Sequence, residues 1–247
     1  MTHADTDQFL EGLRASRLLD ETRLQELRTH PAAFDGDIEG LSRYARERGW
    51  LSPFQLQEAK AGRASRLLVG GYSLLEQLDP HPAGPTFLAQ QPALSQPVSL
   101  RLIRPDWLAP RDSVGAYLVR AQAACLANSP HLTNILDAGM YEETPFVVQE
   151  YVDGCDLRRL VQEMGPMPPS LACEYARQAA LALQVAHNRG LVHGAISPQA
   201  LLLSPVKRTV NEATGAVSVR PKMGSTIKLA DLGLAPLRPP LNSLNAA

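Results

Sequence analysis

Hydrophobic positions recur at helical spacing in the first quarter of the chain. Residues 1–66 carry apolar side chains three and four positions apart, and a weak repeat at an offset of 32 relates residues 19–26 to residues 51–58. In each copy a polar residue, Asp20 or Ser52, stands where the N-cap of a helix is expected. This pattern predicts a small all-α domain that consists of two helix pairs.

Local signals inside this helical region strengthen the prediction. Pro53 follows Ser52 as a first helical residue, and Ser52 and Gln55 have the spacing of a capping box. Trp50 and Phe54 lie at an apolar spacing that is typical of a hydrophobic core, and much less typical of a ligand site. We therefore expect both rings to belong to a hydrophobic core, with the helices packed on each other or on the next domain.

From Leu67 onward the pattern changes to short apolar runs separated by glycine and proline, which is typical of β-strands. Strands are predicted over residues 72–78, 86–90, 98–103, 132–136 and 145–149. Helices are predicted over residues 114–127, 156–164 and 169–190. The long third helix repeats small or apolar side chains at alternating steps of four and three, which predicts one packing face. The members of this face are Ala172, Ala176, Ala179, Leu183 and Ala186.

Residues 204–226 have the pattern of a β-hairpin around an Asn-Glu-Ala-Thr-Gly turn. The predicted hairpin carries the basic residues Lys207, Arg208, Arg220 and Lys222. Two interpretations remain open. The charges protect a solvated sheet edge, which is the more common case, or they bind an anionic partner.

Two motifs carry the candidate chemistry of the chain. Residues 191–203 read LVHGAISPQALLL, and residues 227–235 read IKLADLGLA. Together they resemble the catalytic loop and the metal-binding motif of the eukaryotic-like bacterial serine/threonine protein kinase family. His193 stands at the histidine of the family's His-Arg-Asp triplet, and Asp231 stands at the aspartate of its Asp-Phe-Gly motif.

Several polar residues of the family pattern are replaced in this chain. Ala195 occupies the position of the catalytic aspartate, Ser197 that of the following lysine, and Ala200 that of the metal-binding asparagine. Leu232 stands in place of phenylalanine, whereas Gly233 matches. Asp231 is therefore the one surviving candidate for a metal ligand.

The resemblance also implies a nucleotide site before these motifs. The loop at residues 79–84 replaces a glycine-rich phosphate loop and keeps only Gly84 as a match. Arg101 stands at the phosphate-binding lysine, and Arg120 at its glutamate partner. Residues 150–152, including Glu150 and Val152, resemble the hinge, where the backbone would bind adenine.

The resemblance implies an α+β fold with a protein-kinase-like N-lobe, made of an antiparallel β-sheet plus one helix, over residues 67–149. A hinge at residues 150–154 and a partial helical C-lobe at residues 155–247 follow. The chain ends 14 residues after Gly233, so the expectation is a C-terminally truncated lobe. Either a protein partner covers the missing part, or the chain is a truncated gene product.

Composition narrows the possible classes of function. With 45% hydrophobic residues, 20% charged residues and a net charge of -1, the chain has the profile of a globular protein, which argues against nucleic-acid binding driven by charge. Its three cysteines fit no disulfide or metal pattern, its polar start is unlike a signal peptide, and no apolar run is long enough for a membrane span. A cytoplasmic protein is expected.

The substituted motif leads to the prediction that the chain is not an enzyme. It would be a pseudokinase that acts as a signalling or scaffolding module for a protein partner, with no cofactor or only weak binding of ATP and Mg²⁺. The alternatives are a divergent serine/threonine kinase with weak activity and a non-functional fragment. Asp231 is expected to pair with Arg101 or Arg120, or else to face solvent or bond its own turn.

Overall fold

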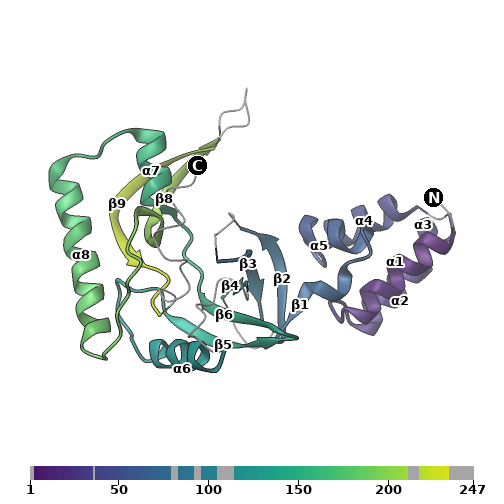
Figure 1. The fold of residues 1–247 in the computed structure, drawn as a ribbon. Coiled ribbons are helices and arrows are strands. Elements are labelled where there is room, and N and C mark those ends of the chain that lie inside the picture. The colour runs from purple at the N-terminus through teal and green to yellow at the C-terminus, as the bar shows by residue number, and fades with distance from the viewer. Residues whose placement is uncertain are drawn as a thin grey trace, which may run out of the picture. The chain divides into compact units, whose positions relative to one another are not determined.

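The computed structural model describes residues 3–35, 37–78, 83–91, 96–104, 114–210 and 217–233. The chain divides into two compact units, Met1–Arg101 and Leu102–Ala247, and each is described by itself. Figure 1 gives the labels of the helices and strands used below. The predicted domain boundary after residue 66 stays a prediction.

The first unit begins with helices. They are α1 (His3–Ala15), α2 (Glu21–Thr29), α3 (Pro31–Phe34), α4 (Ile38–Glu47) and α5 (Pro53–Lys60), followed by the short 3₁₀ helix η1 (Ala64–Leu67). Their apolar faces meet in a core whose centre is fully buried, with Leu13, Leu27 and Leu41 at 0% exposure. Burial of such side chains is the main stabilising contribution in a small helical unit. The prediction of a helical region before the sheet is confirmed.

The predicted helix caps are present. The side chain of Asp20 accepts a hydrogen bond from the backbone N–H of Arg23 at 2.8 Å. Ser52 and Gln55 form the complete capping box. The same two side chains also reach strand β2, because Ser52 Oγ donates to the Leu75 carbonyl and Gln55 Nε2 donates to Ser73 Oγ at 2.9 Å. The caps therefore also attach α5 to the sheet that follows.

The expected core position of Trp50 and Phe54 is wrong. Both rings are only half-buried. Trp50 packs edge-on against Tyr44, with centroids 5.7 Å apart, whereas Phe54 lies against Phe87 at 5.9 Å. The apolar spacing placed both rings on one cluster, but the turn at Gly49, where φ is 67°, directs Trp50 back onto α4.

The strands of the first unit are antiparallel neighbours. They are β1 (Leu68–Val69), β2 (Tyr72–Gln77), β3 (Thr86–Gln90) and β4 (Val98–Leu102), paired in that order. Three of them match the strands predicted from the sequence. The first four residues of the predicted phosphate loop, 79–82, lie outside the described residues.

The second unit contains helix α6 (Val114–Cys125) and the hairpin of β5 (Ile135–Tyr141) and β6 (Thr144–Glu150). Helix α6 packs along β5 (Figure 1). Strand β5 begins later than predicted. Leu132 lies outside it because this residue forms a separate parallel bridge with Leu229. The apolar run at residues 132–136 is thus divided between a bridge and a strand.

The remainder of the unit places helices beside a second sheet. Its elements are β7 (Cys155–Asp156), α7 (Leu157–Met164), α8 (Pro169–His187), the 3₁₀ helix η3 (Pro198–Ala200), β8 (Leu201–Val210) and β9 (Val217–Leu229). The strand order is β7-β8-β9, and all neighbours are antiparallel. The predicted hairpin is confirmed, and it is longer at its base than predicted. Helix α8 lies beside β9 (Figure 1).

The buried face of α8 differs from the predicted one. Ala179 and Ala186 are buried as expected, but Ala172 and Ala176 are exposed. The face is shifted because it includes a polar residue, Gln178, which is 5% exposed. Sequence periodicity counts apolar side chains, so it assigned a glutamine to the surface. The members of the observed face are Tyr175, Gln178, Ala179, Ala182 and Ala186.

Candidate functional site

The loop that follows α8 is fixed by His193, which is 1% exposed. Its Nδ1 accepts a hydrogen bond from the backbone N–H of Ala195 at 3.2 Å. The opposite nitrogen, Nε2, lies 2.7 Å from the carbonyl oxygen of Ala230. Since a carbonyl oxygen can only accept, Nε2 carries the proton and donates, and the ring is the neutral Nε2–H tautomer. His193 therefore joins this loop to the residue that precedes Asp231.

The substituted motif positions lie beside the same strand end. The N–H of Ala200 donates to the Ser197 carbonyl at 2.9 Å, and the N–H of Ala230 donates to the Ala200 carbonyl at 2.8 Å. Ala200 is buried, whereas Ala195 and Ser197 are half-buried. Hydrogen bonds thus connect Ser197 and Ala200 with Ala230, the residue before Asp231.

Asp231 has an unusual backbone conformation for a residue with a side chain. Its φ angle is 67°, in the left-handed region, and the carboxyl group is half-buried. Leu232 behind it is 2% exposed and belongs to the core formed with α6. A side chain at Gly233 would begin 3.7 Å from the Arg120 carbonyl oxygen. Left-handed non-glycine residues persist where the surroundings fix them, and they cluster at functional sites.

The hinge residues follow directly after strand β6. The N–H of Glu150 donates to the Asn134 carbonyl at 2.8 Å, and Tyr151 and Val152 continue outside any helix or strand. Two residues after Val152, Gly154 is packed so tightly that an added Cβ would lie 2.1 Å from the Leu203 carbonyl oxygen. The hinge is therefore fixed at its start by a backbone bond and at its end by a glycine contact.

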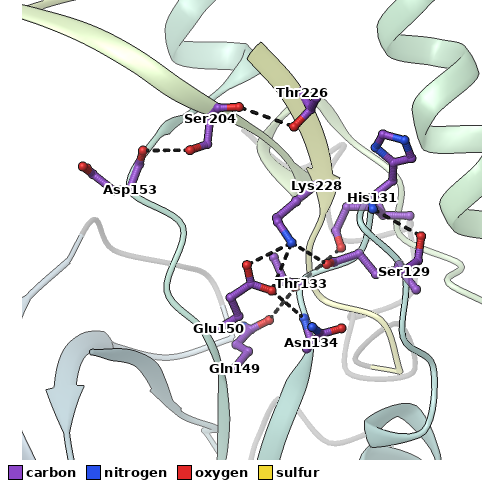
Figure 2. Close-up of polar contacts among 12 residues, drawn as sticks. Ser129, His131, Thr133, Asn134, Gln149, Glu150, Asp153, Ser204, Thr226 and Lys228 are labelled. Atoms are coloured by element: carbon purple, nitrogen blue, oxygen red, sulfur yellow. Dashed lines mark hydrogen bonds and ion pairs between the residues drawn. The ribbon is translucent and has the colours of Figure 1, made fainter. Parts of the chain in front are cut away.

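A lysine that the sequence reasoning did not single out anchors the hinge side chain. Lys228 Nζ lies 2.9 Å from Glu150 Oε1 and donates to Glu150 Oε2 at 3.1 Å (Figure 2). The Lys228 side chain is 22% exposed and that of Glu150 31%. Lys228 stands three residues before Asp231. The ion pair thus links the hinge to the strand that carries the candidate metal ligand.

A second contact links the same two segments. Thr133 Oγ1 donates to Gln149 Oε1 at 3.1 Å, and the Thr133 backbone N–H donates to the Leu229 carbonyl at 3.0 Å (Figure 2). Both side chains are buried. The Gln149 amide is therefore held in one orientation.

Strand β9 is supported from the side of α8. Gln178 Oε1 accepts from the Ile227 backbone N–H at 2.7 Å, and Gln178 Nε2 donates to Glu174 Oε1 at 2.8 Å. The Arg177 guanidinium, and then the Gln178 amide, lower the pKa of Glu174 to about 2. Three side chains of α8 thus form a relay that ends on the edge of β9.

The remaining candidate residues belong to the first unit. Arg101 is 7% exposed, and its Nε donates to Thr86 Oγ1 at 2.9 Å. Gly84 is buried, with a φ angle of 143° that favours glycine. The predicted pairing of Asp231 with Arg101 or Arg120 stays a prediction.

The side chains available as metal ligands limit the cofactor that the site could hold. Among the described residues no group of three or more His, Cys, Asp and Glu side chains could hold a metal ion. Mg²⁺ takes one or two protein carboxylates and completes its shell with phosphate oxygens and water. Asp231 would supply one such carboxylate if a nucleotide supplied the phosphate oxygens.

A comparison with protein families shows to which family this chain belongs. Residues 109–240 match the family described as protein tyrosine and serine/threonine kinase. The chain belongs to the protein tyrosine and serine/threonine kinase family. Its kinase-like fold is supported by the kinase domain of PknI from Mycobacterium tuberculosis, at a TM-score of 0.56 and 22% identity, over 68% of this chain and 61% of that one.

Curated kinase relatives match about half of the chain. Serine/threonine-protein kinase PknB of Mycobacterium leprae is 32% identical over 136 residues, 53% of this chain and 21% of the relative. Serine/threonine-protein kinase PrkC of Bacillus subtilis is 26% identical over 136 residues, 55% of this chain and 21% of the relative. The chain spans about a fifth of the length of the curated relatives it matches.

The prediction that the chain is not an enzyme is wrong. The kinase family match and the relatives, which are named serine/threonine-protein kinases, contradict it. The prediction was wrong because it considered only the side chains that are missing at Ala195 and Ala200. It gave too little weight to the backbone frame, in which His193, the hinge and Asp231 are all held in place.

Membrane spans and thiols bear on the compartment of the protein. In the part of the chain that the structure describes, no helix combines the length and apolar character of a membrane span. Cys125, Cys155 and Cys173 are free thiols. Burial raises the pKa of the Cys155 thiol and of the Cys125 thiol, which disfavours the reactive thiolate at both positions.

Proposed function

We propose that this chain is part of a divergent serine/threonine protein kinase that binds ATP and transfers phosphate slowly. The observation that carries the proposal is the left-handed Asp231, whose φ angle is 67°. Its neighbours hold it on both sides, since Ala230 is bonded to His193 and Leu232 is buried against α6. A strained backbone at Asp231 is understandable if its carboxylate binds a ligand.

The hinge supplies the adenine side of the proposed site. Adenine recognition in such a site uses backbone N–H and C=O groups, so it does not require particular side chains at residues 150–152. The Glu150–Lys228 ion pair and the Glu150–Asn134 backbone bond hold this segment in place before binding. Such preorganisation improves affinity because less ordering is needed when the ligand arrives.

The phosphate side would rely on Asp231. This residue would hold Mg²⁺, which draws negative charge from the phosphate oxygens when bound. In the first unit, taken by itself, Arg101 retains the positive charge of the lysine that it replaces, and Thr86 orients its side chain.

Slow transfer follows from the substituted loop. Ala195 has no carboxylate to accept a proton from the attacking hydroxyl, and a positioned general base contributes about 10²–10⁴-fold in rate. Ser197 keeps a hydroxyl but no positive charge. Electrostatic stabilisation, which supplies much of the catalysis in phosphoryl transfer, would remain through Mg²⁺ held by Asp231.

Calorimetric titration with ATP, with and without Mg²⁺, tests the binding step, and radiolabelled phosphate transfer tests the reaction. We expect a Kd within the range of about 1 µM–1 mM that is common for enzyme substrates. Asp231→Asn should abolish the Mg²⁺-dependent gain in affinity and leave adenosine binding unchanged. Asp7→Asn, on the exposed side of α1, is the matched control. Absence of ATP binding, or transfer that persists in Asp231→Asn, would refute the proposal.

A further inference from the structure

The outer half of the β8–β9 hairpin presents a basic face, which we define as Lys207, Arg220 and Lys222. Lys207 is the direct cross-strand partner of Arg220. Because side chains alternate along a strand, Lys222 lies on the same face, two residues beyond Arg220. All three residues are exposed.

The opposite face of the same strands is built differently. Val206 and Val219 are 7% and 1% exposed and pack into the core with α7. The one cation on that face, Arg208, forms an ion pair with Asp153. The packed face therefore follows the usual rules, with apolar residues inside and each charge compensated.

The basic face lacks such compensation. None of its three cations forms an ion pair with a described residue. The nearby acid Glu163 is already engaged, since it accepts from the Val219 backbone N–H at 2.7 Å and from Arg159 at 2.8 Å. Like charges placed directly opposite one another destabilise a strand pair. The opposition of Lys207 and Arg220 is thus a cost to folding that a bound anion would remove.

The end of the basic face is shaped by a bulge in β9. Ser225 Oγ accepts from the Lys222 backbone N–H at 2.8 Å and donates to the Pro205 carbonyl at 2.7 Å. This bond holds the extra residues of β9 as a fixed protrusion, in which Met223 is fully exposed at 102%. A flexible thioether beside a cation offers an apolar contact to a partner that the charge attracts.

We propose that the basic face binds an acidic peptide segment in an extended conformation. Alternate residues of an extended peptide are about 7 Å apart, which is the spacing of Arg220 and Lys222 along β9. Thr209 and Ser218, the next cross-strand pair on this face toward the turn, add hydroxyl groups there, and Ser218 Oγ donates to the Thr209 carbonyl at 3.4 Å. Three cations on adjacent strands form a patch suited to a short carboxylate-bearing segment. An overall charge of -1 does not favour binding of a long polyanion driven by bulk charge.

Fluorescence anisotropy with a labelled peptide of eight glutamates tests this proposal. We expect saturable binding at 20 mM NaCl that weakens at 200 mM, because exposed charges are screened. The double variant Lys207→Glu/Arg220→Glu should lose affinity at least about tenfold, or 1.4 kcal/mol. The matched control is Arg43→Glu/Arg46→Glu, which changes the net charge equally at exposed positions of α4. It should retain affinity within about twofold at 200 mM NaCl.

Two further measurements distinguish a specific loss of binding from misfolding of the variant. A peptide of eight lysines should bind Lys207→Glu/Arg220→Glu and not the unmodified chain, which a misfolded variant could not reproduce. Arg220→Gln, which only removes one of the opposed charges, should raise the melting temperature while weakening binding. Equal loss in both double variants, or no binding of the glutamate peptide at 20 mM NaCl, would overturn the proposal. Tighter binding of a 12-base-pair DNA duplex or of phosphatidylserine vesicles would overturn it as well.

Discussion

The two halves of the β8–β9 hairpin share one sheet and differ in almost every other respect. In the inner half Leu203, Ile227 and Leu229 have 0% exposure, and Lys228 is paired with the hinge. In the outer half the cations Lys207 and Arg220 face each other and solvent. The comparison indicates that the inner half is constrained by the site, whereas the outer half is constrained only by its own pairing.

The largest effect should come from breaking the connection at the inner end. His193→Ala removes two hydrogen bonds and leaves the Ala230 carbonyl without its buried donor. We expect a loss of about 3 kcal/mol in the free energy of unfolding, measured by urea denaturation. His187→Ala, at the exposed end of α8, is the control and should cost less than about 0.5 kcal/mol. A small loss in His193→Ala would show that the loop does not depend on the histidine.

The same substitution in each half sharpens the comparison. Lys228→Met leaves the Glu150 carboxylate without its ion pair, so we expect a loss of about 1–2 kcal/mol. Weaker ATP binding should accompany it. Lys207→Met removes an opposed charge and should change stability by no more than about 0.5 kcal/mol. Urea denaturation and calorimetry measure both quantities. Equal losses in the two variants would contradict the distinction between the halves.

The smallest effect concerns acid and the support of β9 by α8. Glu174 has a folded pKa of about 2, below its ordinary value of 4.5, mainly because of Arg177. Its contribution to stability is therefore complete above the unfolded pKa and is lost as the pH falls through 4.5 toward 2. Because Glu174 is solvent-exposed, we expect only a modest effect. Glu174→Gln should flatten the dependence of the unfolding midpoint between pH 5 and pH 3, and an unchanged slope would contradict the relay.

Local signals were sufficient to predict much of the fold. The caps at Asp20 and Ser52 depend on residues three positions apart, so the sequence displays them directly. Strands β2 and β3 follow from short apolar runs between turn residues. The motif spacing also singled out His193, which the structure joins to the residue before Asp231.

Long-range polar contacts were the part that the sequence did not reveal. Lys228 and Glu150 are 78 residues apart, and Gln178 and Ile227 are 49 apart. No periodicity relates such positions, because their pairing is decided by the packing of whole elements. The same reason explains the shifted face of α8, where the buried Gln178 accepts a hydrogen bond from the backbone of β9. It also explains the mistaken enzyme prediction, which judged side chains without the bonds that hold the loop.

Gly154, at the end of the hinge, couples any movement of the hinge to movement of the β8–β9 hairpin. Gly154 lies against the Leu203 carbonyl with no space for even a methyl group, so the hinge segment and the base of β8 have to move together. From Leu203 to Val210 the strand extends roughly 23 Å at 3.3 Å per residue. A rotation of about 5° at the hinge would therefore displace the outer end by about 2 Å. A fluorophore attached near Thr209 would convert a ligand's arrival at the hinge into a measurable displacement far from it.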